Sequence, residues 1–236
     1  MFVTINGASL NVEVFGADDA PVLIAHHGGG GIGSLAEPRA TFGPLADLFR
    51  VIVFDARGCG DSEGLPPYSH EQWAADDMDP DLMHEHARNQ DRVEINWDNF
   101  DRYWSGRITD DADLKARWAE LIPLYDFDYD PVKSAAAVEA GKYRHESHNW
   151  CFQQNMPVYD LKPLLPGVTC PTLVTVGRAD WVTPVSAAET IAGLIPDSRL
   201  VIFEKSGHSP QIEEFDAFQA LMREFLLGVL AGDRTG

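Results

Sequence analysis

Short apolar runs separated by turn residues open the chain. Phe2 to Ile5 and Leu10 to Phe15 alternate apolar and polar positions on either side of Asn6-Gly7, which is the pattern of a β-hairpin with a tight turn. Val22 to Ala25 and Val51 to Asp55 are nearly continuous apolar runs. Each of these two runs predicts a buried strand.

The pattern changes to helical spacing in the middle of the chain. Trp97 to Trp104, Asp113 to Leu124 and Val132 to Ala140 repeat apolar positions every three or four residues, which predicts three helices. A further helix is expected over Gly43 to Phe49, between the two buried strands. No strand is expected from Pro80 to Asn155, so this stretch is interpreted as a helical insertion.

The strand pattern returns in the last third of the chain. Thr172 to Val176 and Leu200 to Phe203 are charge-free runs that predict two more buried strands. Pro184 to Leu194 lies between them and Glu213 to Leu230 follows them, and both have the spacing of helices. Strands that alternate with helices predict an α/β fold with a mostly parallel sheet.

An acid and a histidine follow these last two strands. Asp180 ends the Gly177-Arg178-Ala179-Asp180 stretch after the first strand, and His208 comes directly after Gly207 beyond the second. Catalytic groups of open α/β sheets gather at the carboxyl ends of strands. A carboxylate bonded to one ring nitrogen fixes the imidazole tautomer, and the other nitrogen can then take a proton from a nucleophile. Asp180 and His208 are therefore candidates for the acid and the base in a Ser, Asp, His order; the alternative is two loop residues with no shared task.

A run of glycines follows the strand that ends at Ala25. His26-His27 leads into four consecutive glycines, Gly28 to Gly31. Glycines in series let several backbone N–H groups point into one concavity, which is what an oxyanion hole requires. The backbone of Gly28, Gly29 and Gly30 is therefore a candidate oxyanion hole, and a flexible loop is the alternative.

One stretch, Gly60 to Gly64, fits the letters of the G-x-S-x-G nucleophile motif. A nucleophile elbow needs a strand that runs directly into the serine and a helix that starts from it. Here the strand ends at Asp55, and Leu65-Pro66-Pro67 prevents a helix from starting. Ser62 is therefore interpreted as a structural residue and not as the nucleophile.

Composition narrows the classes of partner. The 37 acidic residues outnumber the 18 basic ones, which gives a net charge of -19 and argues against binding to nucleic acid or to an anionic membrane surface. Cys59, Cys151 and Cys170 are widely spaced and form no C-x-x-C motif, so neither a disulfide framework nor a metal site is predicted, and no cofactor is expected. The chain has no basic, apolar leader and no apolar run of membrane-spanning length, so a cytoplasmic location is expected.

With these residues in view, the chain resembles the α/β-hydrolase superfamily, and within it the proline iminopeptidase-like branch. His27 to Gly31 is similar to the H-G-G-P-G oxyanion loop of that branch, with glycine in place of the proline. Asp55 to Ser62 is similar to its D-x-R-G-x-G-x-S loop. Gly177 to Asp180 and Gly207-His208 match the segments that carry the triad acid and the triad histidine.

The resemblance implies a domain division and a set of substrate contacts. Residues 1–77 and 156–236 would form the hydrolase core, and residues 78–155 would form the helical cap. The candidate substrate-binding residues are His27, Glu146 and Trp181. Cap glutamates of the peptidase members hold the free amine of the substrate, and Glu146 is similar in setting; a solvated helix glutamate is the alternative.

One departure from the family outweighs these matches. In the family a strand, the serine elbow, a helix and another strand precede the cap, whereas here Ala75-Asp76-Asp77 leads almost directly into cap-like sequence. Such a segment would have roughly 50 to 60 residues at ordinary element lengths. Its loss would remove the nucleophile and leave a gap of about 10 Å in the middle of the sheet. The sheet must then close up or be completed by a second copy of the chain.

The matching motifs and the missing segment are compatible with two functions. The first is a serine hydrolase that acts on an ester, an amide or an N-terminal peptide bond of a small molecule or short peptide, with its catalytic serine segment absent from the chain. The family resemblance favours such an enzyme, and the missing segment predicts that the chain as written is inactive or impaired. The second is a non-catalytic, hydrolase-like binding or regulatory protein.

Overall fold

The computed structural model describes residues 1–232 apart from residues 6, 29–30, 65–93 and 157–159. The described chain forms two compact units. The first unit takes residues 1–64, Ile95–Leu121 and 132–156, and the second takes Ile122–Pro131 and 160–232. These boundaries differ from the predicted core and cap, which follow the order of the family fold, and that division stays a prediction.

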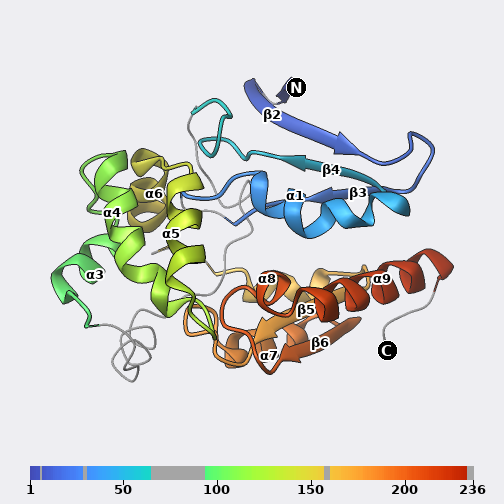
Figure 1. Ribbon diagram of the computed structural model, residues 1–236. Helices are drawn as coiled ribbons and strands as arrows, with labels where there is room; N and C mark the ends of the chain where they lie inside the picture. The colour runs from blue at the N-terminus through green and yellow to red at the C-terminus, as the bar shows by residue number, and fades with distance from the viewer. Residues whose placement is uncertain (6, 29–30, 65–93, 157–159, 233–236) are drawn as a thin grey trace. The chain divides into compact units, whose positions relative to one another are not determined.

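Four strands form the sheet of the first unit: β1 (Phe2–Ile5), β2 (Ala8–Phe15), β3 (Val22–Ala25) and β4 (Arg50–Phe54). The order across the sheet is β1-β2-β4-β3, as Figure 1 shows for β2, β4 and β3. β1 and β2 pair antiparallel and Gly7 has a φ of 80°, so the predicted hairpin is confirmed. β3 pairs parallel to β4.

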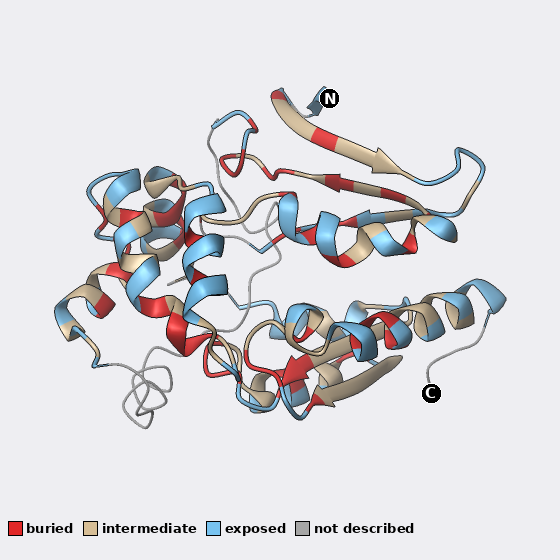
Figure 2. Ribbon diagram, viewed as in Figure 1, coloured by how far each residue is buried: buried red, intermediate tan, exposed pale blue. Residues whose placement is uncertain are grey.

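The two faces of this sheet differ in burial. α1 (Ala36–Phe42) and the 3-10 helix η1 (Gly43–Asp47) pack on β4, in which Val51 and Val53 are fully buried (Figure 2). The expected helix over residues 43–49 is therefore a short 3-10 turn that follows α1. The pattern did not predict α1, because its sequence contains Pro38; proline is tolerated in the first turn of a helix.

The expectation that β3 is buried is wrong. Val22 is 59% exposed and Ile24 is 65% exposed, and both lie on one face of the strand. Among the described strands β3 has a neighbour, β4, on one side only. The apolar run predicted the strand correctly, but its burial depends on a neighbour that the described chain does not supply.

The middle of the chain is helical, as predicted. Its elements are α3 (Trp97–Trp104), α4 (Asp111–Leu121), the 3-10 helix η2 (Ile122–Leu124), α5 (Pro131–Ala140), α6 (His145–Trp150) and the π-helical turn η3 (Cys151–Asn155). The aromatic side chains of α3 pack together: the ring of Tyr103 contacts Trp104 at 5.0 Å and Phe152 at 6.0 Å between centroids. These aromatic residues therefore build a core within the first unit.

A parallel pair of strands forms the sheet of the second unit. β5 (Thr172–Gly177) and β6 (Ser198–Phe203) pair along their whole length. α7 (Val185–Leu194) packs on both strands, and the 3-10 helix η5 (Lys162–Gly167) precedes them. α8 (Pro210–Glu213) and α9 (Phe215–Ala231) follow. The predicted order of strand, helix, strand and closing helix is confirmed.

β5 is less buried than predicted. Its first four residues are half-buried, and only Val176 and Gly177 are buried. Each strand of this pair has one neighbour among the described strands, whereas a strand in the middle of a parallel sheet has two. The described strands thus belong to two sheets instead of one, and no described strand lies between β4 and β5 in the chain.

Candidate active site

The loops after β5 and β6 approach each other closely. Arg178 donates its backbone N–H to Phe203 at 2.8 Å, and Ala179 donates to Ser206 at 3.0 Å. A Cβ at Gly177 would meet the carbonyl oxygen of Gly207 at 2.0 Å, so only glycine fits at the end of β5. This approach brings the acid loop and the histidine loop together.

The structure confirms that Asp180 and His208 are neighbours. Nδ1 of His208 lies 3.1 Å from Oδ1 and 3.0 Å from Oδ2 of Asp180. Because an ionised carboxylate only accepts hydrogen bonds, Nδ1 carries the proton and donates it. Nε2 is then the nitrogen that can receive a proton from another group.

The Asp180 carboxylate is buried and held from several sides. It is 5% exposed, and Oδ1 accepts the backbone N–H groups of Val182 at 2.9 Å and Thr183 at 3.0 Å. Oδ2 accepts the hydroxyl of Thr183 at 2.8 Å. Burial acts to raise the pKa of Asp180, but the hydrogen bonds and the charge of His208, together with the donors of Thr183, hold it below its usual value. The carboxylate is thus ionised and fixed in orientation.

An aromatic residue that the sequence pattern did not single out completes this group. The ring of Tyr125 stands edge-on to His208 at 5.2 Å and to Trp181 at 5.5 Å between centroids. The carbonyl oxygen of Tyr125 accepts the backbone N–H of His208 at 2.8 Å. Trp181 itself is buried beside Asp180. Its predicted contact with a substrate stays a prediction.

The glycine loop lies in the first unit. Gly28 is described, whereas the candidate oxyanion residues Gly29 and Gly30 lie outside the described residues. Gly31 has a φ of 78°, and its carbonyl accepts the backbone N–H of Arg144 at 2.8 Å. The loop is thereby joined to the start of α6. Its role as an oxyanion hole stays a prediction.

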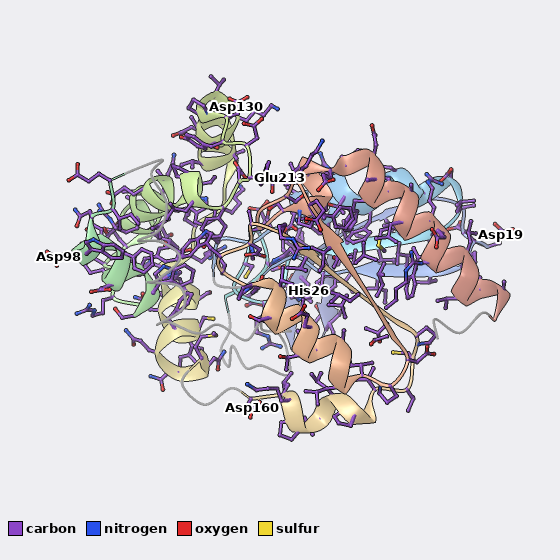
Figure 3. All side chains as sticks on the ribbon, turned by 90° about the horizontal axis from the view of Figure 1, so that it is seen from below. Asp19, His26, Asp98, Asp130, Asp160 and Glu213 are labelled. Carbon is purple, nitrogen blue, oxygen red and sulfur yellow. The ribbon has the colours of Figure 1, made fainter. Side chains whose placement is uncertain are left out.

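His27 is buried under this loop, next to the exposed His26 labelled in Figure 3. Its Nε2 accepts the backbone N–H of Ala56 at 2.9 Å, and Nδ1 bonds to the carbonyl of Gly28. Burial lowers the pKa of His27 to about 4, so the ring is neutral near pH 7. Both nitrogens hold the backbone of two loops, and contact with a substrate stays a prediction.

Ser62 also serves the backbone. Its hydroxyl donates to the carbonyl of Asp55 at 2.7 Å and accepts the N–H of Asn11 at 2.8 Å, and the residue is 1% exposed. The Asp55 carboxylate binds the N–H groups of Leu35 at 2.6 Å and Asp61 at 2.9 Å. The loop after β4 is therefore a closed hydrogen-bonded structure, which supports the structural interpretation of Ser62.

The last candidate, Glu146, is an exposed residue in the first turn of α6. Neighbouring side chains fasten this helix to the loop after β4: Ser147 donates to the carbonyl of Gly58 at 2.6 Å, and Arg144 donates to that of Gly60 at 3.1 Å. Recognition of a substrate amine by Glu146 stays a prediction.

Among the described residues, no group of three or more His, Cys, Asp or Glu side chains has the arrangement of a metal site. In the same part of the chain, no helix has the length and apolar character needed to cross a membrane.

Comparison with known proteins identifies the family of the chain. A model of the alpha/beta hydrolase fold matches residues 21–93 and 109–215. The proline iminopeptidase PfmaB of Pestalotiopsis fici is 28% identical, and the match covers 95% of this chain and 98% of the relative. That alignment has 278 positions, but 95% of 236 residues is about 224, so about 54 positions (278 minus 224) have no residue of this chain opposite them.

Solved structures show the same fold at lower sequence identity. The enol-lactonase from Burkholderia xenovorans is 22% identical, with a TM-score of 0.72 over 96% of this chain and 100% of that one. A thermophilic esterase from Thermogutta terrifontis is 24% identical, with a TM-score of 0.70 over 97% of each chain. The family match covers most of the sequence, and the chain belongs to the α/β hydrolase fold family.

Proposed function

We propose that this chain is a serine-hydrolase-type protein for ester, amide or N-terminal peptide bonds, whose Asp180 and His208 form the acid–base pair and whose nucleophilic serine belongs to a segment that the chain lacks. The observation that carries the proposal is the contact of His208 Nδ1 with both oxygens of a buried, ionised Asp180. A dyad with that tautomer leaves Nε2 as the base.

A serine hydroxyl supplies both the nucleophile and the proton that such a dyad requires. His208 Nε2 takes the hydroxyl proton while the serine oxygen forms a bond to the carbonyl carbon of the substrate. The imidazolium then gives this proton to the leaving alcohol or amine as the carbon–heteroatom bond breaks, and water releases the acyl group by the same route. Asp180 stabilises the imidazolium throughout. The predicted glycine loop, Gly28 to Gly30, would bind the oxyanion.

Three observations support a missing nucleophile. The Ser62 hydroxyl, in the stretch that fits the nucleophile motif, is buried and bonded to backbone groups on both sides. About 54 positions of the alignment with the proline iminopeptidase have no counterpart here, which agrees with a lost segment of roughly 50 to 60 residues. The described strands also form two sheets.

A serine-directed fluorophosphonate probe tests the proposal. We expect no labelling of the chain as it stands. We expect labelling, and hydrolysis of p-nitrophenyl acetate or of proline p-nitroanilide, once the residues of the Pestalotiopsis fici relative that have no counterpart here are inserted as one segment after Asp77, a position outside the described residues. The same inserted protein with His208→Ala is the matched control and should lose both.

The outcomes separate the parts of the proposal. Labelling of any serine in the unaltered chain would show that its nucleophile is present. A folded inserted protein that is neither labelled nor active would overturn the role of His208 and Asp180. It would also favour the alternative function, a hydrolase-like protein that binds a ligand without turnover.

A further inference from the structure

A carboxylate next to the histidine loop joins two segments that are far apart in the sequence. Glu213, labelled in Figure 3, lies at the end of α8. Its Oε1 accepts the backbone N–H of Gly207 at 2.7 Å, and its Oε2 accepts the backbone N–H of Phe127 at 2.6 Å. Both distances are short for N–H···O hydrogen bonds, as is typical of a charged acceptor.

The same two segments also touch directly. The backbone N–H of His208 donates to Tyr125 at 2.8 Å. A Cβ at Gly207 would meet that same carbonyl oxygen at 2.1 Å, so the approach is as close as a backbone allows. The ring of Tyr125 lies against the imidazole of His208. Residues 125–127 therefore form one wall of the histidine loop, and Glu213 ties that wall to the loop.

The Glu213 carboxylate is partly buried, which disfavours its charged form. Burial and the nearby charge of Asp126 raise the pKa of Glu213, while the N–H groups of Phe127, Gly207 and Ser209 lower it; burial is the largest effect and the net shift is upward. A neutral side chain would avoid that cost. The two hydrogen bonds are thus the feature of Glu213 that requires explanation.

We propose that Glu213 is a positioning residue for His208: by holding the N–H groups of Gly207 and Phe127 on one carboxylate, it fixes the imidazole against Asp180 and Tyr125. This inference rests on the proposed role of His208 as the base. Glu213 does not touch the reacting atoms and acts through the backbone on either side of His208. Without it the hydrogen bonds that join Gly207 and Phe127 through one carboxylate are lost.

Ring signals of His208 in the nitrogen-15 NMR spectrum test the inference without any turnover. Comparison with His208→Gln identifies the His208 signals among the eight histidines. In the unaltered protein we expect one tautomer with the proton on Nδ1. In Glu213→Gln, which keeps the side-chain shape but can accept only one of the two N–H groups, we expect mixed or broadened ring signals. Amide exchange at Gly207 and Phe127 should become roughly tenfold faster or more.

A matched control is available on the same edge of the sheet. Glu204 is exposed and pairs with the exposed Arg178 at 2.6 Å, so Glu204→Gln should give the ring signals of the unaltered protein. Unchanged His208 signals in a folded Glu213→Gln protein would overturn the inference. If Glu213→Gln does not fold, amide exchange in the unaltered protein decides. Protection of Gly207 and Phe127 to the same degree supports the inference, and free exchange at either one refutes it.

The NMR and amide-exchange results do not depend on the hydrolase test. A disordered His208 ring in Glu213→Gln would support the positioning role even if the inserted protein described above shows no activity. Conversely, an active inserted protein with an unperturbed His208 ring in Glu213→Gln would leave the hydrolase proposal standing and remove only this one.

Discussion

Nδ1 of His208 and the Asp180 carboxylate are paired through both oxygens, at 3.1 and 3.0 Å, although Asp180 also accepts three bonds from Val182 and Thr183. A side chain with this many partners has little freedom to turn. The orientation of the imidazole is therefore set by the loop after β5, one strand away from its own.

Replacing Asp180 by asparagine should lower the free energy of unfolding above pH 4. The pKa of Asp180 lies below its usual value of 3.8, so its ionised form stabilises the fold. That contribution is present above pH 3.8 and is lost as the pH falls through the lowered pKa. Since hydrogen bonds to charged groups contribute about 1.5 to 3 kcal/mol, we expect a loss of this size at pH 7. Denaturant unfolding as a function of pH measures it.

The exposed Asp128 provides the comparison for this measurement. Asp128→Asn should change the free energy of unfolding by less than about 0.5 kcal/mol. Equal losses at pH 7 and well below pH 3.8 in Asp180→Asn would contradict the ionised, stabilising carboxylate.

The close approach of the loops after β5 and β6 predicts a strong effect of a single methyl group. Gly177→Ala would place a Cβ 2.0 Å from the carbonyl oxygen of Gly207 and 2.4 Å from that of Ser206, so the histidine loop must move. Overpacking of this kind costs about 1 to 3 kcal/mol. We expect that loss in thermal or denaturant unfolding, together with shifted NMR signals of His208.

Gly193 in α7 is the matched site, because a Cβ there meets no atom within 4 Å. Gly193→Ala should leave His208 unchanged and stabilise the protein by about 0.5 to 1 kcal/mol, since alanine favours the helix over glycine. A Gly177→Ala protein as stable as Gly193→Ala would show that the two loops are not packed as described.

A buried histidine in the first unit predicts acid sensitivity. His148 is fully buried against Tyr103 and Phe152, at 4.5 and 4.6 Å between ring centroids. Burial lowers its pKa from 6.5 to about 4, so the unfolded chain binds more protons between these values. Stability therefore falls as the pH drops from 6.5 to 4, by about 3 kcal/mol for this one group.

His148→Leu should remove that part of the acid dependence. The leucine fills the aromatic site without a polar atom, so we expect the free energy of unfolding to vary less between pH 7 and pH 4 than in the unaltered protein. The exposed Gln154 provides the control, because Gln154→Leu also replaces a polar side chain by leucine but removes no titratable group, and it should keep the original profile. An unchanged profile in His148→Leu would refute the assignment.

The hydrogen bonds of the buried Ser62 hydroxyl predict that Ser62→Ala lowers the stability of the protein. Ser62→Ala leaves the N–H of Asn11 and the carbonyl of Asp55 without the hydroxyl that now joins them. Unsatisfied buried groups cost about 1 to 3 kcal/mol each, so stability should fall measurably. The exposed Ser186 gives the control, Ser186→Ala, which should be nearly neutral. We expect this loss of stability with no fluorophosphonate labelling of either protein. Labelling of the unaltered chain that disappears in a folded Ser62→Ala protein would identify Ser62 as a nucleophile.

Features with a local cause could be predicted from the sequence. The hairpin depends on Asn6-Gly7, where glycine supplies a positive φ, and the pairing of β1 with β2 follows from it. Asp180 and His208 could be found because each lies within five residues of the end of an apolar run, and parallel strands end at the same edge. In both cases the residues that determine the feature lie close together in the sequence.

Features that depend on distant neighbours could not be predicted. Tyr125 lies in a stretch without a motif, and it reaches His208 only because two backbones meet at Gly207. Glu213 looks like an ordinary helix residue until its partner at Phe127 is known. The exposure of Val22 and Ile24 was not predicted for the same reason, because an apolar run does not show how many strands lie beside it in the sheet.

The outer edge of β3 has a consequence for the behaviour of the protein in solution. Among the described strands this edge faces no other strand, and such edges are templates for pairing with another molecule. A net charge of -19 makes the molecules repel one another, and dissolved salt weakens that repulsion. Colloidal stability should therefore depend on ionic strength: dilute buffer keeps the molecules apart, and concentrated salt allows the unpaired edge of β3 to self-associate.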